Sequence, residues 1–285
     1  MGGEAASNVA TRLTTQFRPK CLAMVGVCAG WRGKVKLGDV VLADRLFRYD
    51  AGKIKTNIDN GNNEDVFLRD IKTYNLNPKW KQNAEDLATA WRPLEWHFEK
   101  PFGYEYQETW LINSLATVEK GDSSKLIQSE ERKRMCPDWT TVLNRLEKKA
   151  LISVDRDLAL TKKGRAFAKE RSIRSPDGPP EQETSAKAHI APIGSGTQVI
   201  EDPGLFPQIA LSVRKILGVE MEGSAVANVA AIEGVEHCVV AKGVSDHADP
   251  DKDDRFRPFA IEASYRFLRQ IIEENLVPAQ KKTLS

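Results

Sequence analysis

Two short, almost continuously apolar runs constrain the fold of this 285-residue chain more than any other feature. One is CLAMVGV at 21–27 and the other is CVVAKGV at 238–244. Runs of this length suit strands that are covered on both faces, as the central strands of a parallel sheet are. Apolar residues recur at helical spacing over the first 17 residues and again over about 256–276. This alternation predicts an α/β fold with a mostly parallel or mixed central sheet and flanking helices.

The middle of the chain differs from its two ends. Four tryptophans lie among charged residues between 80 and 110, and the segment 125–175 holds 14 Lys and Arg against 7 Asp and Glu. Within it, residues 139–171 are expected to form a helix, a β-hairpin and a second helix, an order that resembles a winged-helix module. Residues 172–189 hold three prolines and few apolar residues, which is typical of a linker. The sequence therefore predicts a core at 1–72 and 186–285, interrupted by a mainly helical insertion at 73–185.

Composition and spacing exclude several classes of protein. No apolar run approaches the roughly 20 residues of a membrane span, and the first residues lack a secretory signal, so we expect a cytosolic protein. The four cysteines and four histidines show no metal-ligand or disulfide-framework spacing. Neither a dinucleotide-binding fingerprint nor a P-loop is present. We therefore expect no metal and no cofactor.

Two carboxylates directly follow predicted strands. Asp246 follows the run CVVAKGVS, and Glu222 follows GVEM. Ligands of open α/β sheets bind at the carboxyl ends of the strands, so both acids are expected at one crevice. Acidic residues are also favoured at helix N-termini, where they accept hydrogen bonds from free N–H groups. On local pattern alone, helix capping is the simpler interpretation.

The order and spacing of four motifs favour a catalytic role. The segments VEMEGSAVANVA and VVAKGVSDHAD are similar to the paired signature of the nucleoside phosphorylase and methylthioadenosine/S-adenosylhomocysteine nucleosidase superfamily. VGVCAGWRGKVKLGDVVLAD resembles that superfamily's TGSAGGL-to-GDIVV segment, and SGTQVI occupies the place of its purine-contacting stretch. The resemblance covers about 1–49 and 191–276. It implies the superfamily's α/β fold and the cleavage of a purine N-glycosidic bond.

The resemblance also implies individual roles. Asp246 would protonate the departing purine at N7, Glu222 would hold the ribose hydroxyls, and Met221 would pack against the sugar. These residue types suit the reaction, because cleavage places negative charge on the base and positive charge on the ribose. Val199 and Ile200 fall where the superfamily has an aromatic and an apolar residue against the base, and a valine cannot stack. Further substrate contacts are expected from Val27, Cys28 and Ser245.

Two departures from the superfamily pattern concern the nucleophile. Phosphorolytic relatives present an Arg and a Ser where this chain has Met24 and Val27, so we expect water as the nucleophile, with phosphorolysis as the alternative. The superfamily also begins with a strand that carries the water-activating carboxylate, whereas this chain begins at the later helix. An inactive nucleotide-sensing module, whose insertion contacts nucleic acid, is therefore the alternative of another class.

Basic residues after the first predicted strand bear on the 5′ group of the substrate. Arg32 and Lys34 would contact the 5′-phosphates of a nucleotide, and a solvated basic loop is the other interpretation. The combined pattern resembles the phosphorylase-like effector domains of bacterial signalling and anti-phage proteins, some of which degrade adenine nucleotides. We predict a homo-oligomer that hydrolyses adenine nucleosides or nucleotides and releases the base. Nucleic acid and membranes are not expected as partners.

Overall fold

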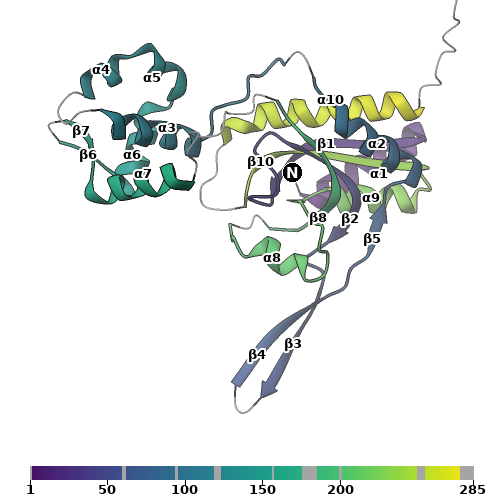
Figure 1. The fold of residues 1–285 in the computed structure, drawn as a ribbon. Helices are drawn as coiled ribbons and strands as arrows, with labels where there is room; N and C mark the ends of the chain where they lie inside the picture. Colours follow the sequence, from purple (N-terminus) through teal and green to yellow (C-terminus); the bar gives the residue numbers. More distant parts are fainter. Residues whose placement is uncertain are drawn as a thin grey trace, which may run out of the picture. The chain divides into compact units, whose positions relative to one another are not determined.

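Residues 1–100 and 185–285 form one structural unit, unit 1, and residues 101–184 form a second, unit 2. The computed structural model is drawn in Figure 1. It describes residues 2–59, 62–93, 96–118, 123–155, 157–174, 185–198, 201–248 and 254–276. None of the helices in these ranges is long and apolar enough to cross a membrane.

Unit 1 is built around a mixed six-stranded sheet. Its strands are β1 (Cys21–Gly30), β2 (Val40–Arg48), β5 (Thr73–Asn75), β8 (Ala188–Ser195), β9 (Gly218–Glu220) and β10 (His237–Asp246). Their order is β10-β1-β9-β8-β2-β5, and a further pairing joins β10 to β2. The pairs β1–β10, β2–β8 and β8–β9 are parallel, and the others are antiparallel. The predicted mixed α/β sheet is confirmed.

Helices cover both faces of this sheet. They are α1 (Gly3–Phe17), α2 (Pro78–Ala90), α8 (Leu205–Ala210), α9 (Gly223–Ile232) and α10 (Arg257–Leu276), with a 3₁₀ turn at Asp254–Phe256. Side chains of a strand alternate between faces. Accordingly, Val239 and Ala241 pack in the same cluster as Phe267 of α10, whereas Val240 packs in the same cluster as Ala227 of α9. The strands are therefore buried on both sides, which explains their continuously apolar sequences.

A long hairpin, β3 (Gly52–Asp59) and β4 (Asn62–Arg69), extends from the end of β2 and was not predicted. Figure 1 shows it projecting away from the sheet of unit 1. At its base, Arg69 donates through Nε to the carbonyl of Tyr49 at 3.2 Å and through Nη1 to that of Gln208 at 3.2 Å. These bonds fasten the hairpin to the end of β2 and to α8 (Leu205–Ala210).

The boundary between the units differs from the predicted one. Strand β5 and helix α2, which the sequence prediction assigned to the insertion, belong to unit 1. Trp80 and Trp91 are 3% and 4% exposed, and they pack with Phe259 and Phe267 of α10 in the largest cluster of unit 1. Trp96 is partly buried and packs against the same cluster. Trp80, Trp91 and Trp96, three of the four tryptophans that seemed to mark an insertion, thus belong to the core of unit 1 or pack against it.

Unit 2 consists of helices and one short hairpin around its own apolar core. Its elements are α3 (Tyr104–Thr117), α4 (Ser123–Gln128), α5 (Glu130–Met135), α6 (Trp139–Lys148), β6 (Ile152–Val154), β7 (Leu158–Leu160) and α7 (Lys162–Arg174). Buried Glu108 on α3 pairs with Arg145 at 2.6 Å and with Lys149 at 2.7 Å. The winged-helix assignment of 139–171 stays a prediction, and most of the predicted linker, residues 175–184, lies outside the described residues.

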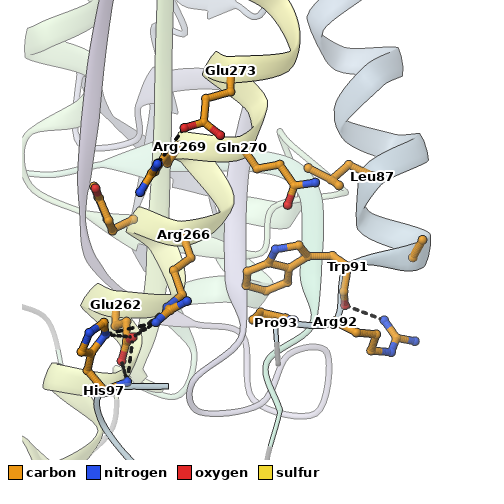
Figure 2. Close-up of a pocket in the computed structure, with 12 residues that line it drawn as sticks. Leu87, Trp91, Arg92, Pro93, His97, Glu262, Arg266, Arg269, Gln270 and Glu273 are labelled. Atoms are coloured by element: carbon orange, nitrogen blue, oxygen red, sulfur yellow. Dashed lines mark hydrogen bonds and ion pairs between the residues drawn. The ribbon is translucent and has the colours of Figure 1, made fainter. Parts of the chain in front are cut away.

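Glu262 of α10 fixes the segment that precedes unit 2. Figure 2 shows its carboxylate pointing toward His97 and Arg266. The backbone N–H groups of His97 and Phe98 donate to it at 2.9 Å, and Arg266 pairs with it at 2.7 Å. Burial alone would raise the pKa of Glu262, but these hydrogen bonds outweigh that effect and lower it to about 2.

Glu262→Gln should reduce the free energy of unfolding at pH 7 by about 1–3 kcal/mol, because several donors lose a charged acceptor. The ordinary pKa of 4.5 applies in the unfolded chain, so the contribution is complete above pH 4.5 and is lost as the pH falls toward 2. Urea unfolding of both proteins between pH 7 and pH 3 measures this. Glu273→Gln, which removes an exposed pair with Arg269, is the control and should change little. A deficit that stays constant with pH would contradict the role of the charge.

Candidate active site

Asp246 ends β10 at the carboxyl end of the central parallel pair. Its Oδ1 accepts a hydrogen bond from the Ala248 N–H at 2.9 Å, and its Oδ2 accepts one from the Ser245 hydroxyl at 2.9 Å. The next residue, His247, donates through Nδ1 to the carbonyl of Gly30 at 2.8 Å. These bonds hold the carboxyl group in a fixed orientation beside the end of β1.

A buried ion pair joins β10 to β9. Lys242 of β10 and Glu220 of β9 have side chains that are 2% and 1% exposed, and Nζ lies 2.8 Å from Glu220 Oε2. The N–H of Gly223 also donates to the Glu220 carboxylate, as does the hydroxyl of Ser195. Burial alone would raise the pKa of Glu220, but Lys242 and these hydrogen bonds hold it below its ordinary value. Glu220 is therefore ionised at neutral pH and anchors the turn between β9 and α9.

Glu222 is the N-cap residue of α9, but its side chain makes no capping hydrogen bond. Its Oε2 instead lies 3.5 Å from Lys242 Nζ, and the side chain is 18% exposed. Burial raises the pKa of Glu222, and Glu220 raises it further, while Lys242 opposes both. The helix-capping interpretation of Glu222 is thus not supported by its geometry, and its carboxylate is left accessible at the edge of the buried pair.

Cys28 lies on β1, the strand between β9 and β10. It is fully buried on β1, and burial raises the pKa of its thiol. The positive charge of Lys242 opposes this increase in the pKa, whereas the negative charges of Glu220 and Asp246 add to it. Gly26 on the same strand leaves the space for the lysine, since a Cβ there would lie 3.1 Å from Nζ. The charged residues Glu220 of β9 and Lys242 of β10 therefore meet beside the small and apolar residues of β1.

The loop after β8 is fastened next to this location. Asp50 accepts hydrogen bonds from both the N–H and the hydroxyl of Thr197 at 2.7 Å. Only glycine fits at 196, because a Cβ there would lie 2.2 Å from the Tyr49 hydroxyl. The predicted base contacts Val199 and Ile200 follow directly, but they lie outside the described residues.

The other predicted contacts occupy different surroundings. Val27 is partly buried on β1, and Met221 lies in the turn before α9, where its carbonyl is close to Gly3 of α1. Arg32 and Lys34 are exposed on the turn after β1, and Lys34 Nζ lies 5.6 Å from the centre of the Trp31 ring. No direct contact between Glu222 and Asp246 is seen in the described part of the chain.

Glu220 and Lys242 were missed by sequence reasoning. The signal was present, because a lysine inside the apolar run CVVAKGV has to be paired when the strand is buried. Its partner was not readable, since the pairing of β9 beside β1 is set by the tertiary fold.

Two further observations limit the kind of site. Within the described ranges, no group of three His, Cys, Asp or Glu side chains could hold a metal ion. A surface pocket of about 620 Å³ is lined by α2, the segment that directly follows it up to His97, and α10, as Figure 2 shows. None of the predicted site residues lines it.

No protein-family model matches the chain. It is 24% identical over 261 residues to the uncharacterised protein y4jS of Sinorhizobium fredii (strain NBRC 101917 / NGR234), which covers 91% of this chain and 44% of that protein. It is 36% identical over 50 residues to the ATP nucleosidase Cap17 of Escherichia coli, or 18% of this chain and 10% of Cap17. The chain therefore spans less than half the length of the curated relatives it matches.

Several solved structures are similar to the chain. One is the 5′-methylthioadenosine/S-adenosylhomocysteine nucleosidase of Neisseria meningitidis in complex with methylthio-immucillin-A, with 14% identity, a TM-score of 0.49 and coverage of 96% of this chain and 78% of that chain. Another is the futalosine hydrolase of Helicobacter pylori strain 26695, with 15% identity, a TM-score of 0.47 and coverage of 96% and 76%.

Proposed function

We propose that this chain hydrolyses the N-glycosidic bond of an adenine nucleoside or nucleotide and releases adenine. The observation that carries the proposal is the orientation of Asp246, which Ser245 and Ala248 hold at the end of β10, the strand that also carries Lys242 with its partners Glu220 and Glu222. A carboxylic acid and a separate, accessible carboxylate at one end of a sheet suit a reaction that develops opposite charges on its two fragments. The ATP nucleosidase among the curated relatives supports the same type of reaction.

In this mechanism Asp246 carries a proton and donates it to N7 of the purine as the C1′–N9 bond breaks. The Ser245 hydroxyl can either donate or accept, so it supports both protonation states of the acid. Glu222 accepts hydrogen bonds from the ribose hydroxyls, and its negative charge stabilises the positive charge on the sugar. Water adds its hydroxide to C1′, and the proton left over replaces the one that Asp246 gave away.

Lys242 and Glu220 support this chemistry by controlling the charge and position of Glu222. The Lys242 ammonium contacts both glutamates, so it favours the ionised form of Glu222 and opposes the increase in pKa that burial and Glu220 cause. Glu220 in turn fixes the turn at Glu222 and Gly223 through their N–H groups. Both residues are positioning residues, since neither has to touch the reacting atoms.

Incubation with defined substrates tests the proposal. Adenosine, methylthioadenosine, S-adenosylhomocysteine, AMP and ATP are each incubated with the protein, with and without inorganic phosphate, and free adenine is followed by chromatography. We expect adenine from at least one substrate without phosphate. Release that requires phosphate would make the enzyme a phosphorylase, and release from none would favour a nucleotide-binding module.

A further inference from the structure

The turn after β1 carries a tryptophan and a lysine that the mechanism above does not use. We propose that Trp31 and Lys34 form the part of the substrate site that selects 5′-phosphorylated nucleosides over uncharged ones. The indole ring lies against the base, and the lysine ammonium binds a phosphate. The inference rests on the proposed function, because Asp246 and a bound purine define where this site must be.

Trp31 follows β1, the strand that pairs in parallel with β10 and so ends close to Asp246. Ala29 is the register partner of Asp246, and the Gly30 carbonyl is hydrogen-bonded to His247. Trp31 comes next, and it packs in the same apolar cluster as Ala248, whose N–H is bonded to Asp246. The indole therefore belongs to the surroundings of the end of β10.

The ring of Trp31 is held in one orientation. It stacks on Phe206 of α8, with ring centres 5.7 Å apart and an angle of 14° between the planes. Its backbone N–H donates to the Leu217 carbonyl at 3.0 Å, which fixes the start of the turn. Trp31 is only partly buried, so some of this rigid aromatic surface remains open. A flat, fixed aromatic surface is what a purine base stacks on.

Lys34 supplies a cation at the same place. The turn folds back so that the N–H of Lys34 donates to the Trp31 carbonyl at 2.9 Å, and Gly33 permits this with a φ of +81°. The ammonium lies 5.6 Å from the ring centre and makes no ion pair with any described residue. A cation above a ring, on a long and exposed side chain, can move from the ring to an anion that arrives with the base.

This combination distinguishes two substrate classes. An uncharged nucleoside gains from Trp31 but has no group for Lys34. A nucleotide also carries a phosphate, which can bind the ammonium of Lys34 that already lies near the Trp31 ring. The cation should therefore affect nucleotides alone, whereas the ring should affect both classes.

The test compares Lys34→Ala, Trp31→Ala and Trp31→Phe with the unchanged protein on AMP and adenosine, with Lys55→Ala, an exposed lysine of β3, as the matched control. We expect Lys34→Ala to raise KM for AMP roughly tenfold, with kcat and the reaction of adenosine unchanged. Trp31→Ala should lower kcat/KM for both substrates roughly tenfold or more, and Trp31→Phe should restore most of it. Circular dichroism and thermal unfolding show whether Trp31→Ala still folds, and Trp31→Phe keeps the test valid if it does not.

Binding of AMP and adenosine to Asp246→Asn, measured by titration calorimetry with and without Lys34→Ala, separates the two proposals. Adenine release from both substrates with equal effects of Lys34→Ala on each would overturn the inference and leave the proposed function intact. Adenine release from neither, together with AMP binding that depends on Lys34, would overturn the proposed function and leave the phosphate site.

Discussion

Asp246→Asn should lower the rate of adenine release by roughly 10²- to 10⁴-fold, which is the usual contribution of a general acid. The asparagine side chain has the same shape, and its oxygen can still accept from the Ala248 N–H. It cannot deliver a proton to the leaving base. The loss should therefore appear in kcat, with little change in KM or in the thermal unfolding temperature.

Asp70→Asn is the matched control for this measurement. Asp70 is exposed after β4, and its backbone N–H, not its side chain, is bonded to the Ala51 carbonyl. Its replacement should leave the rate unchanged. Adenine release that persists in Asp246→Asn would show that another group protonates the base, and the assignment of the acid would be wrong.

Lys242→Met should destabilise the protein by about 3–5 kcal/mol, the typical effect of removing one partner from a buried ion pair. Methionine fills a similar volume beside Gly26, so the main loss is the positive charge between Glu220 and Glu222. Glu220 would then be a buried negative charge without a positive partner, stabilised only by its hydrogen bonds. Urea unfolding at pH 7 measures the free energy directly.

The pH dependence of this variant identifies the cause. Without Lys242 the pKa of Glu220 should rise above its ordinary value of 4.5, because burial is then opposed only by hydrogen bonds. The deficit should be largest at neutral pH and should shrink as the pH falls and Glu220 takes up a proton. Adding Glu220→Gln to Lys242→Met should likewise recover part of the stability. A deficit that neither acid nor Glu220→Gln reduces would point to packing as its source.

Much of the fold could be read from the sequence because its strongest signals are local. The continuously apolar strands β1 and β10 and the helices α1 and α10 lie where their patterns predicted them. The division of the chain was less readable. Trp80, Trp91 and Trp96 looked like features of a separate body, yet they fill the core against α10. Contacts between residues 80–96 and 259–271 join distant parts of the sequence, and no local pattern reports them.

The candidate site shows the same contrast. Asp246, Glu222 and Ser245 could be named because each directly follows a predicted strand. Glu220 and Trp31 could not be assigned, since one depends on the pairing of β9 beside β1 and the other on stacking with a residue of α8. The hairpin β3–β4 was missed because its strands hold many polar residues and resemble a loop.

Lys100 and Ser185, the two residues at which the chain leaves and re-enters unit 1, touch each other. The Lys100 ammonium donates to the carbonyl of Ser185 at 3.0 Å and also lies over the ring of Phe259. A short peptide linker would thus suffice to connect Lys100 to Ser185 in place of unit 2. Unit 2 therefore occupies a position where whole modules can be gained, exchanged or lost during evolution without rethreading the sheet.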